Sequence, residues 1–223
     1  MAEAGKTPAF SELYSAYAAG CLDPSFALLV ETQAAIRQDI STAISVGELV
    51  SGIFLERETP GAMRADALDR VFAAIDADTP MESRRRAARS AGEALSELLD
   101  LPEPLRDAAL EAASESGWKF VAPGLKRLKL DTGGVAETEL FRIAPGAAVP
   151  RHTHEGLEYT LVVAGGFTDE TGAYGPGDLS VKSGEDTHQP VADDDGVCIA
   201  LAVRDGGLKF TGAMGFVQRL MGG

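Results

Sequence analysis

All three histidines of the 223-residue chain fall between residues 152 and 188. His152 and His154 are separated by one residue, so on a β-strand both side chains leave the same face. Glu158 follows shortly after them, and His188 comes from a distant part of the chain. Three imidazoles and one carboxylate suit a divalent transition metal better than Ca²⁺ or Mg²⁺, which prefer oxygen ligands. The spacing therefore predicts one metal site made by these four residues.

The ligand set leaves the identity of the metal open. Zinc is the first expectation, because three histidines and one glutamate can close a tetrahedral Zn²⁺ site. Iron, manganese or nickel would use the same four donors as part of a six-coordinate shell. A closed zinc site favours a structural or sensory role, whereas a six-coordinate metal leaves positions for a substrate or O₂.

The composition restricts the partners and the compartment. The net charge is −14, and such a chain should repel nucleic acid and anionic membranes, so we expect no direct contact with either. No apolar run of about 18 residues and no N-terminal signal pattern are present, which predicts a cytoplasmic protein. The two cysteines, Cys21 and Cys198, are too few for a disulfide scaffold, and we expect both to be buried apolar residues.

The first half of the chain has a helical rhythm over residues 10–115. Asp23-Pro24 is a helix start, with an N-cap followed by proline at the first helical position. Apolar residues then recur every three or four positions over 26–54, which predicts one long amphipathic helix or two helices joined near Gly47. Further helical segments are expected from Thr59-Pro60, over 81–99 and over 105–113.

After Trp118 the rhythm changes to short strands separated by glycine and proline turns. The candidate strands are Trp118–Ala122, Leu125–Leu130, Ala136–Ile143, Leu157–Val163, Asp178–Val181 and Cys198–Val203. Many short strands at this spacing predict an antiparallel sandwich or barrel. The expected fold class is therefore α+β in two domains, a helical domain over residues 1–100 and a β domain over residues 101–223.

The metal-ligand residues lie within a pattern that resembles the cupin family. The first cupin motif is matched by Gly146-x₅-His152-x-His154-x₃-Glu158-x₆-Gly165. In the second motif Gly177 and His188 are in place, but Ser183, Glu185 and Ala192 stand where proline, glycine and asparagine are usual. The resemblance implies a jelly-roll barrel over about residues 102–215, with the four ligands pointing inward. Cupins commonly self-associate through sheet edges, which adds a homodimer through the cupin as an expectation.

A wider resemblance covers nearly the whole chain. The order of a helical domain and a cupin, with similar stretches at 13–20, 66–71, 151–158, 169–172, 174–178 and 210–212, resembles the ChrR-type anti-sigma factors. This implies that the helical domain holds an extracytoplasmic-function sigma factor inactive. It also implies that the metal-bound cupin senses singlet oxygen or organic hydroperoxides. The chain would then be a transcriptional regulator that acts by protein–protein contact.

One departure from that family concerns zinc in the helical domain. Gln33, Arg37 and Ile40 stand where the family's His-x₃-Cys-x₂-Cys ligands would align, and no histidine precedes His152. Arginine cannot deprotonate and isoleucine has no donor atom, so the zinc site of that motif is excluded. Ile40 falls on the apolar stripe, and packing could replace the metal in holding the helices together.

Two other functions remain open at the level of sequence. The chain could be a metal-dependent cupin enzyme, a dioxygenase or isomerase, with Glu155 or Tyr159 as the nearest proton-transfer groups. Both have the strand parity opposite to that of the ligands, which counts against them. It could also be a storage or structural cupin whose metal only stabilises the fold.

Overall fold

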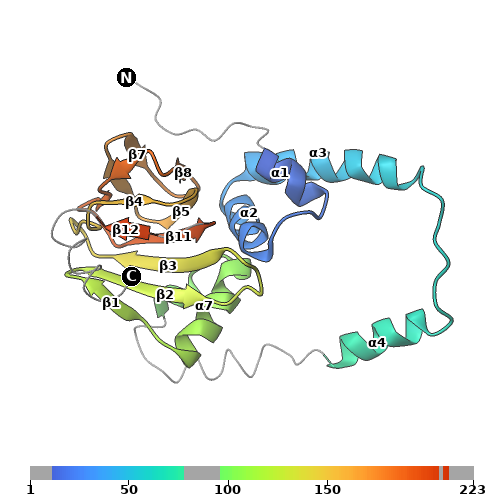
Figure 1. Cartoon of the computed structure of the whole chain (residues 1–223). Helices are drawn as coiled ribbons and strands as arrows, with labels where there is room; N and C mark the ends of the chain where they lie inside the picture. Colours follow the sequence, from blue (N-terminus) through green and yellow to red (C-terminus); the bar gives the residue numbers. More distant parts are fainter. Residues whose placement is uncertain (1–11, 78–95, 206–207, 211–223) are drawn as a thin grey trace.

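The computed structural model describes residues 12–77, 96–205 and 208–210, with helices first and strands after them (Figure 1). The helices are α1 Glu12–Ala18, α2 Pro24–Ile36, α3 Gln38–Leu55, α4 Ala67–Ala77, α6 Ser96–Leu99 and α7 Glu103–Glu115. The strands are β1 Lys119–Ala122, β2 Leu125–Leu130, β3 Glu137–Ile143, β4 His152–His154, β5 Glu158–Ala164, β6 Phe167–Asp169, β7 Gly172–Tyr174, β8 Leu179–Lys182, β9 Thr187–His188, β10 Val191–Ala192, β11 Cys198–Arg204 and β12 Leu208–Phe210. The predicted fold class is confirmed.

The strands form one large and two small sheets, all with antiparallel pairing. The order in the six-stranded sheet is β1-β2-β3-β11-β5-β8, and the three-stranded sheets are ordered β10-β6-β7 and β12-β4-β9. All six predicted strands are present, each with ends within two residues of those expected. The additional strands are only two or three residues long, too short for an alternating pattern to identify them.

The helical half begins as predicted but divides at a different place. The side chain of Asp23 caps α2 by accepting a 2.9 Å hydrogen bond from the backbone N–H of Ser25. The expected junction at Gly47 is wrong, because the break between α2 and α3 falls at Arg37, whose backbone is extended. Gly47 instead lies inside α3, where an added Cβ would be 2.9 Å from the Cβ of Ala18. This glycine therefore allows α1 to pack closely on α3.

The expected helix start at Thr59-Pro60 is also wrong, since α4 begins only at Ala67. Of the helix expected over 81–99, only α6 lies within the described residues. The last predicted helix is present as α7 and extends beyond both predicted ends. None of the described helices is long and apolar enough to span a bilayer.

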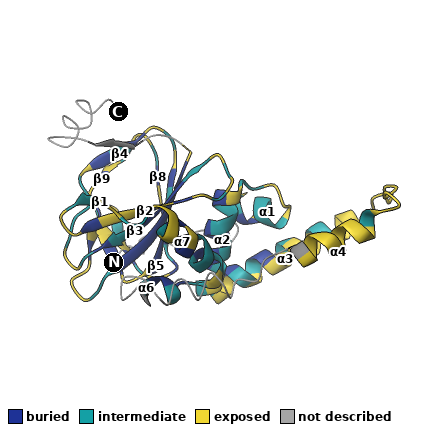
Figure 2. Cartoon of the chain, turned by 90° about the horizontal axis from the view of Figure 1, so that it is seen from below, coloured by how far each residue is buried: buried dark blue, intermediate teal, exposed yellow. Residues whose placement is uncertain are grey.

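The outer face of the six-stranded sheet carries the larger hydrophobic core. Leu29 and Val30 of α2 and Leu105 of α7 are fully buried in one cluster with sheet residues such as Leu161 and Leu201. A second cluster, which includes Phe167 and Ala200, fills the other side of the sheet, inside the barrel. In Figure 2 the buried segments are continuous from the barrel strands to α2 and α7. The helices are thus fastened to the barrel by shared packing.

Strand parity decides which residues face which core. Along β5, Tyr159, Leu161 and Val163 belong to the helix-side cluster, whereas Val162 belongs to the barrel cluster. The same alternation places Glu158 inside the barrel, because successive side chains of a strand point to opposite faces. Strand β11 is buried at every position for the same reason, since both of its faces are covered. The sheet therefore positions both the candidate ligands and the helices.

Candidate metal centre

The structure brings the four predicted ligands together inside the barrel. His152 and His154 lie at alternate positions of β4, His188 pairs with His152 from β9, and Glu158 begins β5. All four residues are buried, and one donor atom of each lies within 4.8 Å of the others. Three of the four come from neighbouring strands of one sheet, so their convergence depends on the β4–β9 register. The buried cluster could hold a metal ion.

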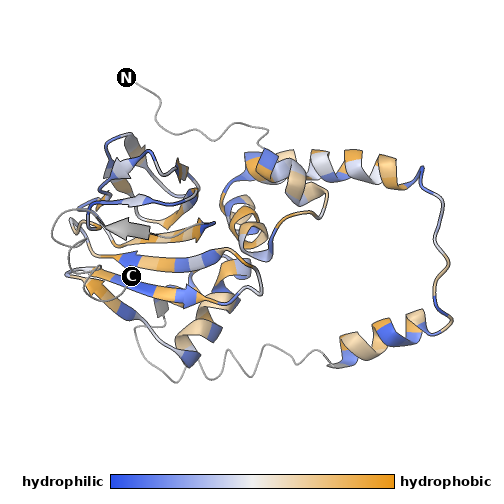
Figure 3. Cartoon of the chain, viewed as in Figure 1, coloured by the Kyte–Doolittle hydropathy of each residue, from blue (hydrophilic) through white to orange (hydrophobic). Residues whose placement is uncertain are grey.

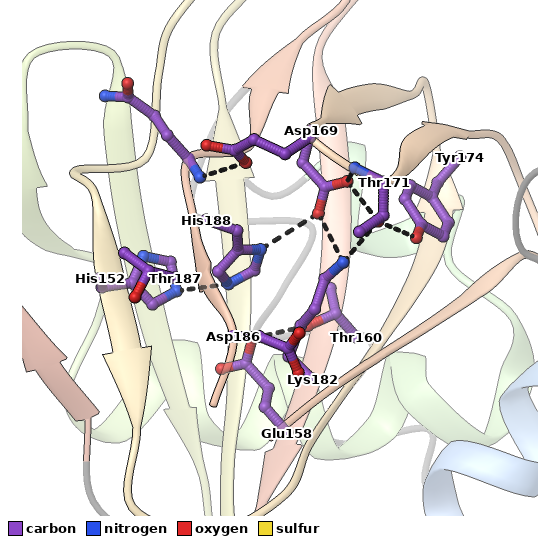
Figure 4. A network of polar contacts seen from close by, with 12 residues as sticks. His152, Glu158, Thr160, Asp169, Thr171, Tyr174, Lys182, Asp186, Thr187 and His188 are labelled. Carbon is purple, nitrogen blue, oxygen red and sulfur yellow. Dashed lines mark hydrogen bonds and ion pairs between the residues drawn. The ribbon is translucent and has the colours of Figure 1, made fainter. Parts of the chain in front are cut away.

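The hydrogen bonds of the rings determine which nitrogen atoms face the centre. His152 Nδ1 lies 2.7 Å from the carbonyl oxygen of Pro150, and His188 Nδ1 lies 3.1 Å from Asp169 Oδ2. Both oxygens can only accept, so both Nδ1 atoms must carry the proton. In the neutral rings, therefore, each Nε2 presents a lone pair. The Nε2 atoms of His152 and His188 are 3.0 Å apart (Figure 4). The Nε2 atoms of His154 and His188 are 3.1 Å apart.

Two facing lone pairs repel each other unless a cation lies between them. Burial is the largest cause that lowers the pKa of His152 to about 4, and burial also lowers the pKa of His154. His152 and His154 are therefore poor partners for a proton at neutral pH. Nitrogen and carboxylate donors of this kind match a divalent transition metal, which binds neutral imidazole. The donor set fits the predicted metal.

Asp169 is the residue that orients His188. Its side chain is fully buried, and its Oδ2 also lies 3.0 Å from Lys182 Nζ. Thr171 donates a 2.6 Å hydrogen bond to Oδ1 (Figure 4). Burial alone would raise the pKa of Asp169, but the hydrogen bonds from His188, Thr171 and Lys182 outweigh it and lower that pKa. Asp169 therefore stays a carboxylate and fixes the tautomer of a candidate ligand.

Glu158 is held by its own set of partners. Its Oε1 accepts a 3.0 Å hydrogen bond from Thr160, and its Oε2 lies 3.4 Å from Nη1 of Arg204. Arg204 is buried and also pairs with Glu137 and Glu139. Desolvation works against its charge, but these three carboxylates raise the pKa of Arg204. The guanidinium thus balances the buried negative charge and orients Glu158.

A small cavity opens beside the cluster. It has a volume of about 50 Å³ and is bounded by His152, Glu158, His188 and Arg204 on its polar side. The remaining lining residues are Val121, Leu125, Phe141, Ile143, Val149, Thr160, Phe167, Pro190 and Ala200. Such a space holds a few water molecules or a compact molecule with an apolar body.

The other candidate residues lie away from this centre. Tyr159 faces the helices, with its ring edge-on to that of Phe26 at a centroid distance of 5.3 Å, and Glu155 is exposed. Gln33 and Ile40 are buried in the helical part. Ile40 lies in the helix-side core, as its place on the apolar stripe predicts.

Asp169, Lys182 and Arg204 also belong to the surroundings of the site, although no sequence pattern marks them. Their charges read as ordinary surface residues, and only the fold shows that their side chains are buried. Asp169 lies in the stretch 169–172, which carries part of the family resemblance but gives no indication of a role at the metal site. Parity does give one signal, because Arg204 shares the inward positions of β11 with Cys198 and Ala200.

An antiparallel barrel with three histidines and one glutamate in its interior defines a cupin-type metal centre. Residues 107–205 match the family model described as the ChrR cupin-like domain. The chain is 34% identical over 200 residues to the anti-sigma-E factor ChrR of Cereibacter sphaeroides, an alignment that covers 89% of each chain. It also matches the crystal structure of Rhodobacter sphaeroides SigE in complex with the anti-sigma ChrR. In that match the TM-score is 0.68 and the identity 31%, with 90% of this chain and 98% of that chain covered. The chain belongs to the ChrR family.

Replacing Asp169 tests the orientation of His188. We expect Asp169→Asn to lower the affinity for Zn²⁺ by about 10- to 100-fold, as is typical when a partner of a ligating histidine is lost. Competition with a chromogenic chelator measures the affinity. Asp66→Asn is the matched control, because that carboxylate pairs with Arg64 at the surface of the helical part, away from the cluster. Equal affinities for Asp169→Asn and the wild type would show that Asp169 does not support a ligand.

The cysteines give a test that depends on pH. The expectation that both are buried is wrong for Cys21, which is exposed, and correct for Cys198. Burial raises the pKa of Cys198 to about 12, so its thiol stays protonated at pH 8, whereas in the unfolded chain the same thiol is partly ionised. A thiol reagent at pH 8 should label Cys21 alone, and Cys198 only after denaturation. Mass spectrometry reads the sites, and rapid native labelling of Cys198 would contradict its burial.

Proposed function

We propose that this chain is an anti-sigma factor whose partner is an extracytoplasmic-function sigma factor. In this proposal, residues 1–100 are the sigma-binding domain and residues 101–223 the cupin domain of a cytoplasmic regulator. The relatives named anti-sigma ChrR support it, including the one solved in complex with SigE. The single observation that carries it is a pair of exposed apolar helix faces, which a soluble monomer would not normally leave uncovered.

The two faces have the same spacing. The exposed apolar residues that form these faces are Val46, Leu49, Val50 and Ile53 on α3 and Leu68, Val71, Phe72 and Ile75 on α4, and Phe54 and Leu55 at the end of α3 are exposed as well. In each helix the residues of the face lie at i, i+3, i+4 and i+7, which puts them on one side. The exposed fraction reaches 67% at Leu49 and is 56% at Phe72. Figures 2 and 3 show both segments as exposed helices with apolar positions, projecting from the barrel.

A sigma factor suits these faces in both shape and charge. Amphipathic helices that present such anchors bind apolar grooves of a partner protein. The chain carries a net charge of −14, which favours a partner with a basic, nucleic-acid-facing surface over nucleic acid itself. The acidic chain would then compete with DNA and polymerase for that partner.

A charge placed on the α4 face should disrupt the complex. Phe72→Asp should weaken binding of the full chain to its sigma factor by about 30-fold or more, because buried aromatic anchors dominate such interfaces. Phe120→Asp is the matched control, because Phe120 is also an exposed aromatic residue, 73% exposed, but lies on β1 of the barrel. Titration calorimetry gives both constants. An unchanged Kd for Phe72→Asp would contradict this docking surface.

We further propose that His152, His154, Glu158 and His188 hold one divalent transition metal, with zinc as the first expectation and iron, manganese or nickel as alternatives. When bound, the metal would supply a Lewis-acidic centre beside the apolar cavity. The protein residues fix the ring tautomers, balance the charge and limit water in the barrel. Singlet oxygen or an organic hydroperoxide is the proposed signal, and a change at the cluster would loosen the hold on the sigma factor.

Loss of two ligands should separate sensing from binding. The double variant His152→Ala, His188→Ala should bind the sigma factor within about twofold of the wild type, because neither residue lies on the α3 or α4 faces. Release of the sigma factor by an organic hydroperoxide should be lost. Cys21→Ser is the control and should respond normally, since Cys21 lies outside the cluster. Unchanged release in the double variant would refute the proposed sensor.

The cavity beside the cluster favours a second candidate function, a metal-dependent cupin enzyme of the dioxygenase or isomerase type. Glu155 and Tyr159, the nearest proton-transfer groups in the sequence, do not line this cavity. Tyr159 packs on Phe26, and Glu155 is exposed. This makes the regulator the better-supported function. Turnover of a small substrate by the metal-loaded chain would favour the enzyme instead. Self-association through the cupin stays a prediction, which a measurement of the oligomer mass can test. A purely structural metal also stays a prediction, and unaltered ligand geometry after peroxide treatment would favour it.

A further inference from the structure

The contact between α2 and the turn before β8 is built around a buried amide. Gln33 is fully buried, and its Oε1 accepts a 2.8 Å hydrogen bond from the hydroxyl of Tyr14. Its Nε2 donates a 2.9 Å hydrogen bond to the carbonyl oxygen of Gly177. One side of this amide therefore holds α1, and the other holds the barrel.

The neighbouring residues shape the same contact. Arg37 Nη1 lies 3.4 Å from Asp178 Oδ1. Gly177 has a φ of +85°, and an added Cβ would lie 2.5 Å from Arg37 Cγ. Any other residue type would be strained in this backbone conformation and would have to displace the side chain of Arg37. The turn at residues 175–178 is thus a socket for the end of α2.

The far end of β8 reaches the cluster. β8 begins directly after Asp178 and ends at Lys182, which pairs with Glu158 across to β5. Lys182 Nζ contacts Asp169, and Asp169 holds His188 (Figure 4). Both neighbours of Lys182 therefore belong to, or directly orient, the candidate ligands. A four-residue strand joins the socket of α2 to the metal centre.

We propose that β8 transmits the state of the cluster to the helical part of the chain. Lys182 is the positioning residue at the cluster end, and Gln33 is the positioning residue at the helix end. A displacement of Asp169 or Glu158 shifts β8, and the socket then loosens its hold on α2. This inference rests on the proposed function, in which the cluster receives the signal.

A double-mutant cycle on the full chain tests this coupling. Lys182→Met removes the contact with Asp169, and Gln33→Glu removes the donor to Gly177 but keeps the acceptor for Tyr14. Hydrogen exchange of the α2 amides, followed by mass spectrometry, is the readout. Each single change should speed exchange by about tenfold, because it leaves a buried polar atom unpaired. In the Gln33→Glu background, Lys182→Met should add less than about twofold.

The matched control uses the other hydrogen bond of the same amide. Tyr14→Phe breaks the bond to Gln33 within the helical part and leaves the bond to Gly177, so Lys182→Met should keep its full effect there. Two sites at opposite ends of a strand are ordinarily independent. If the effects of Lys182→Met and Gln33→Glu simply multiply, to within about twofold, the coupling is refuted.

Replacement variants keep the test decisive if either change prevents folding. Asp169→Asn takes the place of Lys182→Met. Gly177→Ala takes the place of Gln33→Glu, with Gly175→Ala as its control, because the nearest atom to an added Cβ there is 3.9 Å away. The cycle needs neither metal nor sigma factor. A cycle without coupling would therefore not contradict the proposed function. Likewise, failure to form a sigma complex would not change the result of the cycle.

Discussion

The structure depends on three imidazole nitrogens that face one another in the buried interior of the barrel. His152 and His188 have their outer nitrogens fixed by a carbonyl and by Asp169, so their inner nitrogens present lone pairs 3.0 Å apart. Two buried lone pairs at this distance repel each other, and a bound cation would remove that repulsion. The surrounding residues support this arrangement, because Asp169 fixes a tautomer and Arg204 offsets the charge of Glu158. The barrel interior therefore brings three imidazole nitrogens and one carboxylate together at a buried place.

The same strands that present these donors also support the helices. Inward positions of β5 and β11 face the barrel, and outward positions such as Leu161 and Leu201 pack with α2 and α7. Because each strand has side chains in both cores, a movement of the strand on the barrel side also moves its contacts with the helices. A change at the cluster is therefore mechanically connected to the helical part through shared packing, whereas the apolar faces of α4 and of the distal half of α3 are exposed among the described residues. This division is the structural basis of the proposed function, in which the barrel senses and the helices bind the sigma factor.

Much of this arrangement could be predicted from local patterns. Short segments between glycine and proline turns predicted the strands that carry the large sheet, and one-residue spacing predicted that His152 and His154 share a face. Features that depend on tertiary contacts could not be predicted. The helix break at Arg37 accompanies its contact with Asp178 on the turn before β8, while the glycine at 47 that suggested a break serves helix packing. Asp169 and Arg204 look like surface charges until the fold buries them.

X-ray absorption spectroscopy of the purified chain, combined with metal analysis, tests the central claim most directly. The account predicts about one divalent transition metal per chain, with only nitrogen and oxygen neighbours at about 2.0–2.2 Å if the metal is zinc. Three of these neighbours should show the scattering pattern of imidazole rings. A metal with sulfur ligands, or a folded chain that retains no metal when loaded with zinc at neutral pH, would contradict the account.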